Sequence, residues 1–165
     1  MRILGIDPGL AIVGWGVVEK QGMQCIPVAC GAIRTPAHTK VEERLLSIAK
    51  DMNTLIERYK PEEMAVEELF FTNNITTGIA VAEARGVILT VAAHHGLRIS
   101  EYTPPQVKQA VVGYGKAEKR QVIEMVTKLL RLPSPPKPDD TADALAVAYC
   151  HARCVSSRIA PYYNN

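Results

Sequence analysis

Short apolar runs alternate with turn residues over the first third of the chain, a pattern typical of β-strands. Residues 2–6 form an apolar run, Asp7-Pro8-Gly9 supplies turn chemistry, and residues 11–19 are rich in residues that favour strands. A second turn at Gln21-Gly22 precedes another strand-like run over residues 24–35. The pattern predicts three consecutive antiparallel strands joined by tight turns.

The spacing of apolar residues becomes helical after residue 39. From 39 to 59 they recur at alternating steps of four and three, which predicts an amphipathic helix with one face on the sheet. Further strands are expected over residues 64–69 and 97–102, with a helix between them from residue 73 or 74 to 94 or 95. The remaining helices are predicted over residues 106–112, 118–130 and from 139 or 140 to about 155, the last after an extended proline-rich segment.

This order of elements predicts an α/β fold. Three strands in a meander, followed by strands that alternate with helices, give a five-stranded mixed sheet with helices on both faces. At 165 residues the chain is long enough for one substantial core and short for two. We therefore expect one domain over residues 1–155 and a flexible tail over 156–165.

Composition narrows the class of protein. The longest apolar run, over residues 86–93, is far shorter than the ~18 residues of a membrane span, and Asp7 interrupts any signal-peptide core. The four cysteines are too few for a disulfide scaffold at this length and fit a reducing compartment. We expect a protein of the cytoplasm that makes no membrane contact.

Cys150, His151 and Cys154 resemble a metal-binding cluster only faintly. Cys150 and Cys154 are one helical turn apart in an apolar stretch. Free cysteines in such surroundings commonly pack as small hydrophobic side chains, so burial is the favoured interpretation.

Four acidic residues lie at the ends of predicted elements. Asp7 ends the first strand, Glu67 follows a later apolar run, and Asp140 and Asp143 open the last helix on one face. Asp143 is set among small apolar residues, where a desolvated carboxylate needs a counter-charge.

Each of the other acids has an ordinary alternative role. The Asp7 segment can be a turn and nothing more, and Asp140 can be a helix N-cap. Glu67 cannot be told from Glu68, because the strand end is uncertain by one residue. If the acids converge, their repulsion calls for a divalent metal, and an all-oxygen site suits Mg²⁺ or Mn²⁺. Two such ions ~3.5–4 Å apart could activate water and stabilise the leaving oxygen of a phosphodiester.

The net charge of +2 conceals an uneven distribution. Residues 98–131 carry seven basic and three acidic side chains, a local charge of +4 that leaves −2 for the rest. A solvated helix face explains some of these cations. It explains less well the four near the Gly113-Tyr114-Gly115 turn, which we interpret as phosphate-binding: Lys108, Lys116, Lys119 and Arg120.

Phe70 and Phe71 are the only phenylalanines in the chain and directly follow the Glu67 strand. Neighbouring residues on an extended segment point in opposite directions, so one can be core while the other projects beside the acids. The projecting ring can stack on an unpaired base, or both rings can pack; the sequence leaves both open.

Five motifs follow one another along the chain: Gly5-Ile6-Asp7-Pro8-Gly9, Val66-Glu67-Glu68-Leu69-Phe70, Gln106-Val107-Lys108, Ala117-Glu118-Lys119 and Asp140-Thr141-Ala142-Asp143-Ala144-Leu145-Ala146. In this order and spacing they resemble the RuvC family of bacterial Holliday-junction resolvases. Each motif is weak alone, but together they span essentially the whole chain. The resemblance implies an RNase H-like fold and a homodimer. It also implies Mg²⁺-dependent nicks in two opposed strands of a four-way junction, leaving 5′-phosphate and 3′-hydroxyl ends.

The resemblance also assigns roles to residues. Asp7, Glu67, Asp140 and Asp143 match the catalytic carboxylates that hold the metal, two Mg²⁺ per site with Mn²⁺ as a substitute, and Asp139 becomes a bystander. Lys108 and Lys119 match residues at the scissile phosphate, and Phe70 matches an aromatic residue that stacks near the crossover. The family's partners are the branch-migration proteins RuvA and RuvB. Glu68 stands where some members carry Gln, so their preferred cleavage sequence is not carried over.

Three other functions compete with this nuclease. A junction-binding module without catalysis would lack a carboxylate, and none is missing. A nucleotide-binding domain of the actin and sugar-kinase type would need a second domain and a second glycine-rich loop. A RuvC-like nuclease with another nucleic-acid substrate also remains open. For the implied dimer, the small apolar face of Ala80, Ala84, Val87 and Val91 is a candidate interface.

Overall fold

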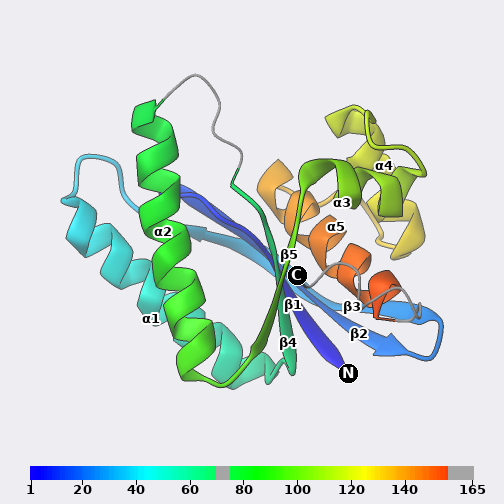
Figure 1. Ribbon diagram of the computed structural model, residues 1–165, viewed down its shortest axis with the longest axis horizontal. Coiled ribbons are helices and arrows are strands. Elements are labelled where there is room, and N and C mark those ends of the chain that lie inside the picture. Colours follow the sequence, from blue (N-terminus) through cyan, green and yellow to red (C-terminus); the bar gives the residue numbers. More distant parts are fainter. Residues whose placement is uncertain (70–74, 156–165) are drawn as a thin grey trace.

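Five strands form one mixed sheet in the computed structural model, which describes residues 1–69 and 75–155. Their order across the sheet is β3-β2-β1-β4-β5 (Figure 1). The first three strands are antiparallel neighbours, and β4 and β5 add parallel to β1. This confirms the predicted α/β fold. The bounds of the strands are β1 Arg2–Asp7, β2 Ile12–Gln21, β3 Gln24–Arg34, β4 Glu63–Glu67 and β5 Arg98–Tyr102.

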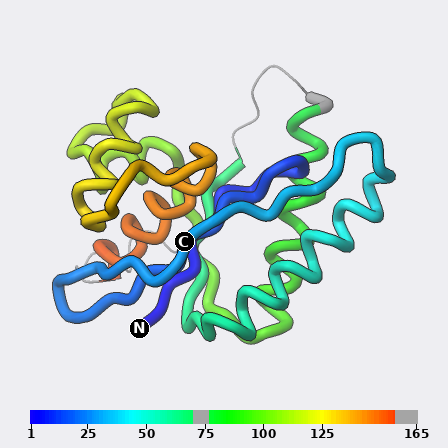
Figure 2. The backbone as a smooth tube through the Cα atoms, turned by 180° about the vertical axis from the view of Figure 1, so that it is seen from behind, coloured from blue at the N-terminus to red at the C-terminus, as the bar shows by residue number. Residues whose placement is uncertain are grey.

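Helices cover both faces of the sheet, as the sequence predicts. Two of them, α1 (Val41–Tyr59) and α2 (Ile75–His94), lie on one face (Figures 1 and 2). The other face carries α3 (Pro104–Val112), α4 (Lys119–Leu129) and α5 (Asp139–Cys154). The predictions for Phe70 and for the tail from residue 156 concern residues outside the described ranges.

Strand alternation decides which residues face α5. Successive side chains of a strand point to opposite faces, and accordingly Ile3 and Ala65 belong to the core beneath α3, α4 and α5. Leu4 and Val66 belong to the core beneath α1 and α2. By the same alternation, the last residue of β1 and the last residue of β4 are on the α5 side of the sheet.

The start of α3 and the cap of α5 differ from the sequence-based prediction. The α3 helix begins at Pro104 rather than residue 106, because its first turn needs no backbone N–H from proline and Thr103 caps it by accepting from the Gln106 N–H. The α5 helix has Pro138 as its N-cap, with Asp139 and Asp140 already inside the first turn. The interpretation of Asp140 as an N-cap is therefore wrong, and its carboxylate is not used for capping.

Glycines on β1 and β2 let α5 approach the sheet closely. A Cβ atom on Gly5 would overlap the carbonyl oxygen of Ala144, and one on Gly14 would overlap the carbonyl oxygen of Asp140. Gly5 and Gly16 are cross-strand partners, and Gly14 is the partner of Asp7. The backbone of α5 therefore rests on a patch of the sheet that has no side chains.

A buried polar chain ties α5 to β4 and β5. His151 is 2% exposed, with Nε2 2.6 Å from Glu63 Oε2 and Nδ1 2.8 Å from the Tyr102 hydroxyl oxygen. Burial lowers the pKa of His151, although the hydrogen bond and charge of Glu63 oppose the shift. In the neutral ring, Nε2–H donates to Glu63 and Nδ1 accepts from Tyr102.

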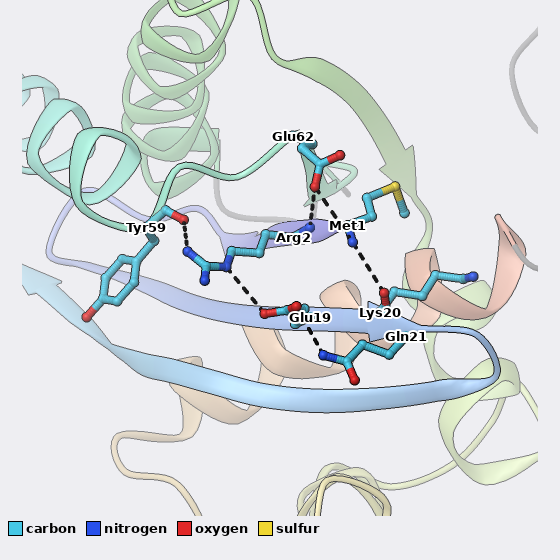
Figure 3. A network of polar contacts seen from close by, with 7 residues as sticks. All are labelled: Met1, Arg2, Glu19, Lys20, Gln21, Tyr59 and Glu62. Atoms are coloured by element: carbon cyan, nitrogen blue, oxygen red, sulfur yellow. Dashed lines mark hydrogen bonds and ion pairs between the residues drawn. The ribbon is translucent and has the colours of Figure 1, made fainter.

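A second polar network fixes the start of β1, at the end of the strand away from Asp7 (Figure 3). The Arg2 guanidinium donates to the Tyr59 carbonyl at 2.9 Å and pairs with Glu19 at 3.4 Å. The backbone N–H of Arg2 donates to Glu62 at 3.0 Å, and the Met1 amino group donates to the Lys20 carbonyl at 3.3 Å. These contacts join the start of β1 to β2, to the end of α1 and to the segment that follows α1.

The predicted dimer face on α2 is largely covered within the single chain. Ala84 is fully buried within the single chain, and Ala80, Val87 and Val91 pack on the same core. The suggested dimer face is therefore wrong at Ala84, because the chain's own α1 and sheet already cover it.

Among residues 1–69 and 75–155, no helix is long and apolar enough to cross a membrane.

We expect Gly5→Ala to lower the free energy of unfolding by about 1–3 kcal/mol, since the added methyl group must push α5 away from the sheet. Urea denaturation measures the change. Gly86→Ala is the matched control, because a Cβ there meets nothing within 4 Å and alanine favours the helix, which should stabilise by about 0.5–1 kcal/mol. Equal stability of the two variants would contradict the close seating of α5.

The lowered pKa of His151 predicts a loss of stability in acid. Between the folded and unfolded pKa values the unfolded chain binds more protons, so the stabilising contribution is full above about pH 6.5 and falls as pH decreases below it. We expect His151→Gln to reduce this loss between pH 6.5 and 5, although the variant is less stable at pH 7. Denaturant titrations at both pH values measure the difference, and parallel losses in both proteins would contradict the prediction.

Candidate active site

Three of the predicted acids meet in one pocket of about 230 Å³ on the α5 side of the sheet. Asp7, Glu67 and Asp143 line it, together with Lys108 and Lys119. Its remaining walls are formed by Pro104, Val107, Val122 and Ala146, and no pattern in the sequence indicates these apolar contacts. The pocket therefore combines carboxylates from three elements with lysines from α3 and α4.

Sheet topology brings Asp7 and Glu67 together. The β1 and β4 strands are parallel neighbours with Ile6 opposite Val66, so both strands end at the same edge and the next residues are adjacent. Alternation places both carboxylates on the α5 side. The same alternation selects Glu67 over Glu68 as the residue of the pocket, which agrees with the family resemblance.

The α5 helix supplies the other acids. Asp143 lines the pocket, whereas Asp140 lies one turn earlier, half-buried, and is not among the lining residues. The charge of Asp140 nevertheless acts on both Asp7 and Asp143. Asp140 is thus part of the electrostatic cluster, at the edge of the pocket.

The acids crowd one another in a partly desolvated space. Burial, followed by the charges of Asp143, Glu67 and Asp140, raises the pKa of Asp7 to about 8. Burial and the charge of Asp143 raise the pKa of Glu67 to about 7, against the lowering effect of Lys108 and Lys119. Burial also raises the pKa of Asp143, although Lys119 opposes it. The two lysines of the pocket supply too little positive charge to offset burial and the repulsion between its carboxylates when all of them are ionised.

Lys119 contacts the acids directly. Its Nζ is 2.9 Å from Asp143 Oδ2 and 4.0 Å from Asp139 Oδ2. Burial opposes the charged form of Lys119, but the hydrogen bond and charge of Asp143 outweigh this effect and raise the pKa of the lysine. The sequence alone connects Lys119 only with phosphate, because residues 119 and 143 are too far apart in sequence to reveal the pair.

The other predicted cations are placed differently. Lys108 lines the pocket from α3. Lys116 and Arg120 are exposed and do not line it. Gly113 ends α3 with a positive φ of 98°, so the expected turn between these cations is present.

The donor chemistry of the pocket fits a hard divalent cation. The acidic side chains that line it offer only carboxylate oxygens as ligands. The raised pKa values of Asp7 and Glu67 indicate that additional positive charge would stabilise their ionised forms. Within residues 1–69 and 75–155, no three His, Cys, Asp or Glu side chains are gathered tightly enough to hold a metal ion. This observation agrees with the position of Lys119, whose ammonium group is bonded to Asp143.

The chain matches known proteins over nearly its whole length. The family model described as crossover junction endodeoxyribonuclease RuvC matches residues 3–151. A protein of that name from Heliobacterium modesticaldum is 56% identical over 160 residues, covering 97% of this chain and 99% of the relative. One from Brevibacillus brevis is 57% identical over 153 residues, covering 93% of this chain and 92% of the relative.

Solved structures agree with this match. T. thermophilus RuvC in complex with a Holliday junction substrate superimposes with a TM-score of 0.89 at 36% identity, covering 94% of this chain and 95% of that one. The yeast mitochondrial resolvase Ydc2, with a TM-score of 0.68 at 14% identity over 98% of this chain and 83% of that one, shares the fold. The fold is RNase H-like, and the chain belongs to the crossover junction endodeoxyribonuclease RuvC family.

Proposed function

We propose that this protein is an endodeoxyribonuclease that resolves four-way DNA junctions in recombination and repair. The observation that carries the proposal is the convergence of Asp7, Glu67 and Asp143 in one pocket beside Lys108 and Lys119. Relatives 56% identical over nearly the whole chain are named crossover junction endodeoxyribonucleases, and the T. thermophilus relative is described in complex with a Holliday junction. The products would carry 5′-phosphate and 3′-hydroxyl ends.

Asp7, Glu67, Asp140 and Asp143 would hold the metal, Mg²⁺ or in its place Mn²⁺, with two ions per site. When bound, these ions supply the positive charge that activates water and stabilises the leaving oxygen. The protein's own task is to keep three of these carboxylates together in a partly dry pocket, with Asp140 at its edge. Family metal dependence and the oxygen-only donor set support this assignment.

The cations would position the DNA backbone. Lys108, on the pocket wall, is placed to hold the scissile phosphate, and Lys119 can exchange Asp143 for that phosphate. The exposed Lys116 and Arg120 would contact neighbouring phosphates. Phe70 would stack on an unpaired base at the crossover, a role proposed from its motif alone.

Two copies of the chain would act together. The described part of one chain contains one such acidic pocket, whereas resolution requires nicks in two opposed strands, which suits a symmetric homodimer. We propose RuvA and RuvB as further partners and the cytoplasm as the site of action, on the family resemblance. We also propose that residues 1–155 act as one nuclease domain followed by a short tail.

The decisive experiment offers the purified protein a mobile four-way junction beside matched duplex, fork and RNA–DNA hybrid, with and without Mg²⁺. Paired nicks confined to the junction and dependent on the metal are expected. Preferred cleavage of the hybrid or fork would instead assign a related nuclease with another substrate. Tight junction binding without any nick would indicate a binding module.

Replacing Asp7 should abolish activity and increase stability. We expect Asp7→Asn to bind the junction but not nick it, and to raise the free energy of unfolding without metal by about 1–3 kcal/mol at pH 8, because one pKa unit corresponds to about 1.4 kcal/mol. A carboxyl whose folded pKa is raised destabilises the protein increasingly as pH rises from about 4 to 8, so the gain should shrink toward pH 5.

Urea denaturation in a chelator, together with junction binding and nicking assays, measures these effects. Asp51→Asn, which removes an exposed carboxylate from α1, is the matched control and should change neither stability nor cleavage appreciably. Normal cleavage by Asp7→Asn would remove this residue from the active site.

The Lys119 contact predicts competition with metal. We expect Lys119→Met to strengthen Mg²⁺ or Mn²⁺ binding without DNA by about tenfold, because a positive charge 2.9 Å from Asp143 is removed, while junction cleavage decreases. Calorimetric titration of the metal measures the affinity. Lys116→Met serves as the control, since its exposed ammonium group does not line the pocket. An unchanged affinity in Lys119→Met would show that the lysine does not compete.

A further inference from the structure

An aromatic ring is exposed in the loop between α3 and α4. Tyr114 follows the glycine that ends α3 and is 46% exposed, whereas every other tyrosine or tryptophan of residues 1–69 and 75–155 is buried or partly buried. Two exposed cations, Lys116 and Arg120, are close to it in the chain. The nuclease motifs include lysines of this region but give the ring no role.

The loop lies against two walls of the acidic pocket. Gly115 packs on Pro105 of α3, where an added Cβ atom would be 3.3 Å from the proline side chain and from its carbonyl oxygen. The preceding residue, Pro104, lines the pocket. The Tyr114 hydroxyl group donates to Gln121 Oε1 at 2.9 Å, and residues on either side of Gln121 in α4 line the same pocket. A DNA strand whose phosphate enters the pocket therefore passes close to the ring.

Hydrogen bonds hold the loop in one conformation. Gly113 has a positive φ of 98°, its N–H donates to the Gln109 carbonyl at 3.0 Å, and its own carbonyl accepts from Gln109 Nε2 at 2.7 Å. Gln121 Oε1 also accepts the Glu118 N–H at 2.8 Å, so the group that holds Tyr114 is itself fixed at the start of α4. A side chain positioned before binding loses little conformational entropy when its ligand arrives.

We propose that Tyr114 stacks on an unpaired base of the DNA strand that enters the acidic pocket, and that it thereby favours junctions over duplex DNA. The role rests on the proposed function. Because the hydroxyl group already donates to Gln121, the ring offers DNA its face rather than its polar end. Every base has a π-face, so such a contact does not depend on sequence.

The ring and the neighbouring cations perform different tasks. Lys116 and Arg120 carry charges that bind phosphates of any DNA. Tyr114 adds no charge and needs a base that is free to stack. Bases inside a duplex are stacked on both sides, whereas bases at the crossover of a junction can leave the stack. The cations therefore contribute affinity for both kinds of DNA, and the tyrosine contributes preference for the junction.

Binding of a four-way junction and of a matched duplex, measured by fluorescence anisotropy in a chelator, tests this division. We expect Tyr114→Ala to weaken junction binding about tenfold and duplex binding by less than about threefold. The slope of log affinity against log salt should not change. Lys116→Met should weaken both substrates and reduce the slope by about one. Equal weakening of both substrates by Tyr114→Ala, or a smaller slope, would overturn the stacking role.

Two further variants separate the ring from its hydroxyl group and from general effects of truncation. Tyr114→Phe keeps the ring, so junction binding should stay within about threefold of the unsubstituted protein. A loss as large as that of Tyr114→Ala would overturn stacking. Met23→Ala removes an apolar side chain, 69% exposed, from the turn between β2 and β3 and is the matched control. It should bind both substrates normally, and melting temperatures confirm that each variant is folded.

Photochemical cross-linking locates the contact. Junctions carry 5-iododeoxyuridine at successive positions around the crossover, and peptide mass spectrometry identifies the residue that is joined to it after irradiation. A cross-link to Tyr114 at one or two neighbouring positions is expected. If the protein binds and nicks the junction but forms no such cross-link at any position, only the role of Tyr114 is overturned. If the protein does not bind the junction, the proposed function is overturned as well.

Discussion

The close seating of α5 on β1 and β2 is the constraint on which the active site depends. Gly5 and Gly14 leave no side chain between the sheet and the carbonyl groups of Ala144 and Asp140. Interiors are packed to near-crystalline density, so one added methyl group would move the helix. Because Asp143 belongs to that helix and Asp7 to the strand beneath it, the glycines set the separation of the carboxylates.

This geometry places the carboxylates in a buried site where their mutual repulsion opposes folding. The pKa values of Asp7 and Glu67 are raised mainly by burial and then by neighbouring acids, and Lys119 offsets only part of the repulsion. A structure selected for stability alone would not keep three carboxylates in one pocket. This loss of stability is consistent with a site that binds a positive charge, whether from a metal or from Lys119.

The α3 helix connects the site to the rest of this face. One side of it presents Lys108 to the acids, and the other closes an apolar cavity with Cys150 and Cys154. The hydrogen bonds of His151 with Glu63 and Tyr102 fix α5 to β4 and β5.

Local patterns in the sequence determined the strands, the helices and the candidate acids apart from the choice between Glu67 and Glu68, since apolar periodicity and strand ends are properties of neighbouring residues. They could not determine contacts between distant segments. The Lys119–Asp143 ion pair, the apolar walls from Val107 and Val122, and the cavity beside Cys154 arise only when α3, α4 and α5 pack on the sheet. Tertiary packing likewise decided that Asp140 is no N-cap and that Ala84 is already buried within the chain. Burial and through-space charge depend on what the fold brings near, and sequence spacing does not encode that distance.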